Sequence, residues 1–458
     1  MASAAEQLAR NANWGALAKA TELKKRIFFV LGALLVYRLG TYIPVPGIDI
    51  RVWNEIFTQK GGGILDMFNM FSGGALQRMT IFALNIMPYI SASIIMQLAT
   101  SIFKNLEELK KEGEVGRMKI NQYTRYLTVL LASVQAYGLA VGLESMQGQS
   151  GSAVLDPGFF FRMSTVITIV GGTVFLMWLG EQITSRGIGN GTSLIIFVGI
   201  VANIPAALAQ FLSQGRAGNV SVALILGVFA MVVAVIAFVV FMERALRKIH
   251  IQYPRRQVGM KVYDGQSSHL PIKVNPAGVI PAIFASSLLL LPTTISTFSG
   301  SQTGPIMSTI LAYFGPGQPL YLAFFTAMIV FFAYFYTANV SFKSDDVAEN
   351  LKNQGGFVPG IRPGKKTEEY FDYVVSRILV AGSAYLALVC LLPEILRSQL
   401  AIPFYFGGTS VLIVVSVTMD TINQVQSHLL AHQYEGLIEK SQLRGRKRNG
   451  AKKAPARR

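Results

Sequence analysis

Long runs of apolar residues recur along the chain, and they constrain its fold more than any other feature. The stretches 27–35, 222–241, 320–335 and 411–417 contain almost nothing else. A helix needs about 20 mainly apolar residues to cross the hydrocarbon layer of a bilayer, which is roughly 30 Å thick. Only 14% of the residues are charged, against about 25% in soluble proteins. The chain is therefore predicted to be an all-α membrane protein.

Ten membrane-spanning helices can be placed on these runs. Their predicted ranges are 24–43, 76–102, 122–143, 159–181, 192–213, 219–243, 276–297, 317–341, 374–393 and 403–422. Most of the 41 Lys and Arg residues then fall on the same side as the N-terminus, whereas the opposite side has only a few, such as Arg51 and Lys60. Positively charged loops stay in the cytoplasm during insertion, so both termini are predicted to be cytoplasmic.

The predicted spans carry no ionisable residue near their centres. A charge at that depth costs at least about 2.5 kcal/mol and is kept mainly for proton, ion or substrate transport. This pattern argues against an ion-driven pump. The sequence also contains no serine-hydrolase, zinc-protease or P-loop motif, and its single Cys and four His residues lack metal-ligand spacing. We therefore expect neither an enzyme nor a metal or cofactor site.

The segment 44–75, on the predicted outer side, contains a short apolar helix that cannot span a membrane. A broad apolar face over about 64–72 is formed by Ile64, Leu65, Met67, Phe68, Met70 and Phe71. This helix either lies flat among the lipid headgroups or folds back into a cavity between the spans. The following Gly73-Gly74 pair permits a sharp reversal and favours the second arrangement.

Two of the predicted spans share a motif. The segments 86–93 and 279–286 have Pro, Ile, Ala and Ser at the same offsets, and each belongs to the second span of a five-span half. Because five is odd, the halves would cross the membrane in opposite senses, as in inverted repeats whose Pro-interrupted helices mark a central pathway. Chance similarity between two apolar helices is the alternative. If the repeat is real, these two spans face each other.

Two loops on the predicted cytoplasmic side are too long to be simple connections. Loop 244–275 has turn residues spaced as in a hairpin, and loop 342–373 contains a basic turn at 360–366. Their positive charge is explained by the orientation bias and by anionic lipid, at about 1 kcal/mol for each Lys or Arg. Basic loops of this kind also dock large partners, including nucleic acid, whose phosphate groups they bind. Their length and turn content favour docking.

Several longer motifs resemble the bacterial SecY family. They are the segments 67–76, 86–93, 110–114, 180–191, 357–364 and 403–410, and the resemblance extends from about Leu23 to Glu435. It implies a clamshell of two inverted five-helix halves with a lateral gate, in which the helix at 64–72 is a re-entrant plug. The predicted parts are an N-terminal cytoplasmic segment 1–23, the halves 24–213 and 214–425, and a basic cytoplasmic tail 426–458.

The resemblance also implies roles for single residues. A hydrophobic pore ring would consist of Ile86, Ile90, Thr192, Ile196, Ile283 and Ile413, although Thr192 departs from the expected aliphatic residue. Docking of a ribosome or a motor ATPase would use Arg255, Arg256, Lys261 and Arg362. Family members work with the small membrane subunits SecE and SecG, and with the ATPase SecA or a translating ribosome, on signal sequences and nascent polypeptides.

The resemblance therefore implies a protein-conducting channel of the bacterial plasma membrane. It would translocate unfolded secretory chains and release hydrophobic segments sideways into the membrane lipid. The principal alternative is a secondary transporter of a small solute, because inverted repeats are common there too. A transporter needs a compact polar site at mid-membrane, for which the only candidates are Asn85, Gln97, Gln135, Thr192 and Asn203.

Overall fold

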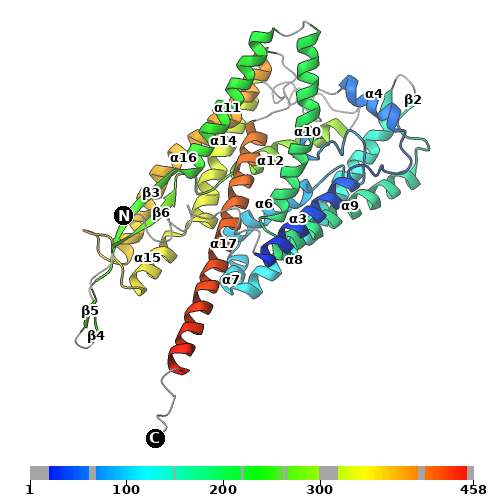
Figure 1. Cartoon of the computed structure of the whole chain (residues 1–458). Helices are drawn as coiled ribbons and strands as arrows, with labels where there is room; N and C mark the ends of the chain where they lie inside the picture. The colour runs from blue at the N-terminus through cyan, green and yellow to red at the C-terminus, as the bar shows by residue number, and fades with distance from the viewer. Residues whose placement is uncertain are drawn as a thin grey trace. The chain divides into compact units, whose positions relative to one another are not determined.

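The computed structural model describes residues 20–60, 69–148, 151–217, 221–254, 256–258, 261–263, 267–298, 318–400 and 408–450, and most of the regular structure in them is helical (Figure 1). The helices are α3 (Thr21–Gly40), α4 (Ile50–Lys60), α6 (Met87–Ile102), α7 (Lys104–Lys111), α8 (Glu114–Ser145), α9 (Phe159–Arg186), α10 (Gly191–Arg216), α11 (Val222–Arg244), α12 (Ile280–Phe298), α14 (Pro319–Tyr336), the π-helical turn η2 (Thr337–Ser341), α15 (Ser344–Asn353), α16 (Lys365–Leu400) and α17 (Gly408–Gly450). The strands are β1 (Gln147–Gly148), β2 (Gly151–Ser152), β3 (Leu246–Gln252), β4 (Arg256–Val258), β5 (Lys261–Tyr263) and β6 (Ser267–Lys273).

Six of the described helices, α8, α9, α10, α11, α14 and α16, are long and apolar enough to cross a membrane. The other four predicted spans are also occupied by helices, namely α3, α6, α12 and α17. The prediction of a multi-pass helical membrane protein is thereby confirmed. That all ten helices cross the membrane stays a prediction.

The second predicted span differs from the structure at its start. It was expected to be helical from residue 76, but α6 begins only at Met87, and the residues before it form successive turns. Met79 and Asn85 have φ angles of +45° and +49°, a conformation that interrupts a right-handed helix. Val45 N also donates to Met79 O at 2.9 Å, so this segment pairs with chain that follows α3. The prediction of a continuous helix from residue 76 was wrong, because the spacing of apolar residues does not reveal such reversals of φ.

The chain divides into two compact units. One comprises residues 1–39, 177–195 and 417–458, and the other comprises 40–176 and 196–416. In the first, α3, the turn after α9 and the C-terminal part of α17 share an apolar cluster of Ala20, Leu23, Ile27, Ile188, Val425 and Leu429. Gly189 N donates to Gln424 Oε1 at 2.7 Å, which fixes this turn to α17.

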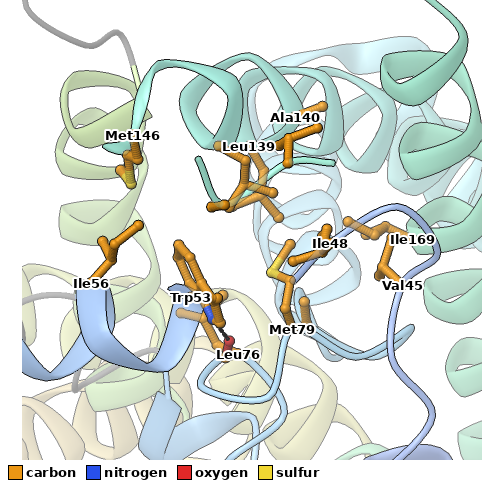
Figure 2. Packing of buried hydrophobic residues seen from close by; sticks show 14 of the residues in the cluster. Val45, Ile48, Trp53, Ile56, Leu76, Met79, Leu139, Ala140, Met146 and Ile169 are labelled. Carbon is orange, nitrogen blue, oxygen red and sulfur yellow. Dashed lines mark hydrogen bonds between the residues drawn. The ribbon is translucent and has the colours of Figure 1, made fainter. Parts of the chain in front are cut away.

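In the second unit, α4 is held against α8, α9 and the turns before α6 (Figure 2). One face of α4 is apolar, and it includes Val52, Trp53 and Ile56, all of which are buried. The Trp53 indole is 1% exposed, and its Nε1 donates to the carbonyl of Leu76 at 3.0 Å. This amphipathic helix therefore packs on protein and anchors the turns that lead into α6.

The loop between α11 and α12 forms the predicted hairpin. Strands β3 and β6 pair in antiparallel fashion with His250 opposite His269, and β4 pairs with β5 farther out (Figure 1). The Tyr253-Pro254 pair lies between β3 and β4. This pair therefore lies between the β3–β6 ladder and the β4–β5 ladder of one long hairpin, and it is not the turn that closes the hairpin.

The second long loop packs against this hairpin. The backbones of Gln252 and Phe357 exchange two hydrogen bonds of 2.9 Å. A buried cluster joins β3, β6, α15 and the start of α16 through Ile249, Ile251, Ile272, Ala348, Leu351, Val358, Phe371, Val374 and Val375. The two loops are therefore a single packed element with its own core.

The turn between α9 and α10 leaves no room for a side chain at Gly191. A Cβ there would lie 1.9 Å from the carbonyl oxygen of Gly180, a backbone atom that cannot move without shifting α9. Gly191→Ala is therefore expected to destabilise the protein by about 1–3 kcal/mol, the usual range for overpacking. The midpoint of thermal unfolding in detergent measures this effect.

Gly227→Ala is the matched control, because a Cβ at this position in α11 meets nothing within 4 Å. Alanine is favoured over glycine inside a helix by about 1 kcal/mol, so this variant should be at least as stable as the parent. Equal losses in the two variants would contradict the steric explanation.

Candidate functional site

The two copies of the shared motif have the same local structure. Ile90 N donates to Ile86 O at 3.1 Å at the start of α6, and Ile283 N donates to Val279 O at 3.2 Å at the start of α12. In each helix the proline of the motif lies in the first turn, where its missing N–H removes no helical hydrogen bond. The motif is therefore a helix start that is repeated in structure as well as in sequence.

Helices α6 and α12 pack against each other, and both pack against α8. The expectation that these two spans face each other is confirmed. The aliphatic side chains at their starts are enclosed, since Ile86, Ile90 and Ile283 are 0%, 7% and 8% exposed. The pair of helices thus encloses uncharged, aliphatic residues at equivalent positions of the repeat.

The remaining predicted ring residues fall into two kinds. Ile196 of α10 and Ile413 of α17 are buried, at 4% and 0% exposed. Thr192 is only partly buried, and its hydroxyl donates to Asn190 Oδ1 at 2.6 Å. The same oxygen accepts from Thr192 N at 3.1 Å, so Asn190 caps α10 and Thr192 belongs to its first turn. This local role accounts for the polar residue at 192, whose membership of the ring stays a prediction.

The described interior contains no fully buried charge. Among the residues that the structure describes, the buried polar side chains are Thr, Asn and Ser only. Moving a charge out of water into hydrocarbon or into the protein interior costs several kcal/mol of desolvation. A buried charge would therefore need a partner of opposite charge. The described interior therefore lacks the charged coupling groups that an ion-driven transporter uses.

Side-chain amides, of which Asn85 is buried and Asn203 partly buried, bind the end of the predicted plug. The carbonyl of Asn69 accepts hydrogen bonds from Gly74 N at 2.9 Å, Ser72 Oγ at 3.1 Å and Asn203 Nδ2 at 3.5 Å. Asn85 Nδ2 donates to the carbonyl of Phe71 at 2.6 Å. We refer to Asn69, Asn85 and Asn203 as the amide clasp. Two of the polar residues considered for a solute site are thus used to bind the backbone.

Of the predicted plug residues, Met70 and Phe71 are buried at 8% and 2% exposed. Residues 69–71 are helical, and the turns that precede α6 follow them directly. Ile64, Leu65, Met67 and Phe68 lie outside the described residues. Sequence reasoning missed Asn69, although an Asn shortly before a Gly-Gly pair is a recognised turn signal.

The predicted docking residues lie on the packed loops. Arg256 and Lys261 belong to β4 and β5, which pair with each other, and Arg255 lies outside the described residues. Arg362 is exposed in a turn between Gly360 and Gly364, whose φ angles of +80° and +102° are in the left-handed region. Its carbonyl accepts from Thr367 Oγ1 at 3.0 Å, which ties this turn to α16.

Comparisons with known proteins agree with this arrangement. The model of the SecY family matches residues 80–422. The protein translocase subunit SecY of Escherichia coli K12 is 54% identical over 425 residues, covering 93% of this chain and 96% of that one. The protein translocase subunit SecY of Rickettsia conorii is 52% identical over 423 residues, covering 92% and 97%.

Solved structures share the fold at low sequence identity. A structure described as that of a protein conducting channel has a TM-score of 0.65 at 20% identity, covering 88% of this chain and 92% of that one. Sec61 in a canine ribosome-channel complex from the endoplasmic reticulum has a TM-score of 0.61 at 18% identity, with the same coverage. The family model and the two relatives, each more than half identical over nearly the whole length, show that this chain belongs to the SecY family.

Proposed function

We propose that this chain is the channel-forming subunit of a bacterial protein translocase, and not an enzyme. The observation that carries this function is the match to the Escherichia coli translocase subunit, which extends over 93% of the chain at 54% identity. The interior agrees with it, since its described part contains no buried charge that could couple transport to an ion gradient. The energy for transport then comes from a partner.

The pathway runs past the starts of α6 and α12. A signal sequence intercalates between these helices, the plug moves aside, and the extended chain passes a ring formed by Ile86, Ile90, Ile196, Ile283 and Ile413. A narrow aliphatic constriction dewets and so blocks ions, whereas it offers a passing polypeptide no specific hydrogen bonds. Hydrophobic segments leave sideways into lipid through the lateral gate.

The partners follow from the family and from the basic loops. In this proposal the chain assembles with SecE and SecG in the bacterial plasma membrane, with both termini in the cytoplasm. SecA or a translating ribosome docks on the element formed by loops 244–275 and 342–373. A solved canine ribosome-channel complex contains Sec61, which has the same fold, and this supports a ribosome as a partner.

Site-specific photocrosslinking from Ile86 and Ile283 tests the function during export of a stalled secretory chain. The nascent chain should form adducts from both positions, because both lie at the starts of the packed helices α6 and α12. Ile167 of α9, which is 67% exposed, is the control position and should give none. Absence of adducts from the two test positions while export proceeds would contradict the proposed pathway.

Polar replacement of the ring should make the channel leak. The triple variant Ile86→Ser, Ile90→Ser and Ile283→Ser places hydroxyl groups at the constriction, where they would support water and ions. We expect a clear rise in ion conductance across planar bilayers compared with the parent. Ile167→Ser serves as the control for a mutated helix surface, and unchanged conductance in the triple variant would count against the ring.

Removal of the amide clasp should free the plug. Asn85→Gly retains a residue that tolerates positive φ but leaves the carbonyl of Phe71 without its donor. A lost buried hydrogen bond costs about 1–3 kcal/mol, so transient exposure of this segment should rise about fivefold or more. The rate of maleimide labelling of Ser72→Cys measures it, in a Cys390→Ala background that removes the single native cysteine.

A buried probe elsewhere separates local release from general loosening. Ser72 and Ser383 are 2% and 4% exposed, so a cysteine at Ser383 reports on the packing of α16. Its labelling rate should not change in Asn85→Gly. A rise at both positions would mean that the variant destabilises the whole protein, and no rise at Ser72→Cys would contradict the clasp.

Ribosome binding should depend on the hairpin charges. Replacement of Arg255, Arg256 and Lys261 by Ala should lower the affinity for ribosomes. It should also lower the slope of log affinity against log salt by about 0.7–0.9 for each lost phosphate contact. The matched control replaces Lys104, Arg117 and Lys119, three exposed basic residues of α7 and α8. Equal effects of the two sets, in sedimentation assays over a salt series, would show non-specific attraction only.

A further inference from the structure

A polar pocket lies where α14, η2, α15 and α16 meet. Its volume is about 440 Å³. Its lining includes Tyr334, Val375 and Leu379, together with charged and hydroxyl side chains from η2, α15 and the first turns of α16. Part of its lining comes from loop 342–373, but none of the residues assigned to the ring or the plug lines it, and neither does any of the docking residues Arg255, Arg256, Lys261 and Arg362.

The pocket lies at the ends of two membrane helices. It adjoins the C-terminal end of α14 and the N-terminal end of α16, and both helices have the length and composition of membrane spans. Tyr334 and Tyr373 line it, and tyrosine is enriched at the level of lipid headgroups. Arg377 also lies over the Tyr373 ring, 5.3 Å from its centroid. A lipid in the adjoining bilayer would reach such a pocket with its headgroup.

The charge of the pocket is opposite to that of the chain. The whole protein carries a net charge of +17, but the pocket lining has the carboxylates of Asp345, Glu368 and Asp372 against the single ammonium of Lys343. Asp372 Oδ1 accepts from the Ser344 hydroxyl, which orients this carboxylate. An acidic lining with one basic group favours a zwitterionic ligand whose positive end is recognised by carboxylates.

A buried hydroxyl in the lining has no partner. Thr337 is 1% exposed, and its Oγ1 makes no hydrogen bond within the described part of the chain. It begins the π-helical turn, in which Phe342 N donates to Thr337 O at 3.0 Å. Unpaired buried hydroxyls are unfavourable, and π-helical turns within α-helices often mark functional sites. This oxygen has less than 1 Å² of accessible area, so a ligand in the pocket would reach and satisfy it through a small shift of the lining.

We propose that the pocket binds the headgroup of a phospholipid that carries a primary ammonium beside its phosphate. The ammonium donates hydrogen bonds to the carboxylates of Asp345 and Glu368, and the phosphate pairs with Lys343 and accepts from the Thr337 hydroxyl. The apolar part of the lining contacts the glycerol backbone and the first methylene groups. A trimethylated ammonium has no N–H donor, so the site discriminates against it.

Native mass spectrometry of the full chain tests this with phosphatidylethanolamine and phosphatidylcholine of identical acyl chains. The ethanolamine lipid is expected to bind about tenfold more tightly, since only it donates charge-assisted hydrogen bonds. Phosphatidylglycerol has the phosphate but no ammonium, and as an anionic lipid it also binds the basic loops, so its binding should not fall in the pocket variant Asp345→Asn with Glu368→Gln. Equal binding of phosphatidylethanolamine and phosphatidylcholine would overturn the assignment.

Two double variants with the same change of net charge show whether the lipid preference arises at the pocket. Asp345→Asn with Glu368→Gln should abolish the preference for the ethanolamine lipid. Glu349→Gln with Glu369→Gln changes one carboxylate on each of the same helices outside the pocket, and should retain it. Midpoints of thermal unfolding show whether both variants are folded. If the first pair leaves the lipid preference intact but weakens copurification of a partner subunit, the pocket is a protein contact and the proposal fails.

Discussion

The bilayer removes water as a hydrogen-bonding partner of the backbone, and the rest of this structure depends on how that loss is met. Regular helices meet it within each segment. The chain between residues 69 and 86 is not a regular helix, so its carbonyl groups need other donors. They receive them from the side chains of Asn203, Asn85 and Trp53, which bind the carbonyls of Asn69, Phe71 and Leu76. Hydrogen bonds from a few specific polar side chains thus stabilise this irregular segment.

The same constraint explains why the interior can be apolar and yet movable. Polar residues in the described interior are used where the backbone leaves its helical path, and the helix starts of α6 and α12 present aliphatic side chains instead. Aliphatic packing is non-directional, so contacts between these side chains do not fix the helices at one separation. The clasp, in contrast, consists of a few directional bonds. In the proposed mechanism, opening would cost hydrogen bonds at the clasp and packing between the helices.

Structural features that depend on a local sequence pattern could be predicted from the sequence. Apolar runs located the helices, the repeated proline motif indicated that α6 and α12 face each other, and turn residues indicated the hairpin. The positive φ angles of Met79 and Asn85 were not predictable, because neither residue requires them. The union of the two loops through Gln252 and Phe357 also escaped prediction, since it joins residues about a hundred positions apart. Family resemblance supplied roles for residues, but it gave no warning of the acidic pocket.

Helices α15 and α16 connect the two charged regions of the loop element. Leu351 and Phe371 on these helices belong to the core beneath the hairpin, whereas Asp345 and Glu368 on the same helices line the pocket. Packed cores are stiff and transmit displacements, so a partner that pulls on the hairpin also acts on the pocket walls. A headgroup bound there would resist such movement by holding the end of α14 to the start of α16. With a partner and a lipid bound as proposed, the loop element would couple the hairpin to the membrane surface.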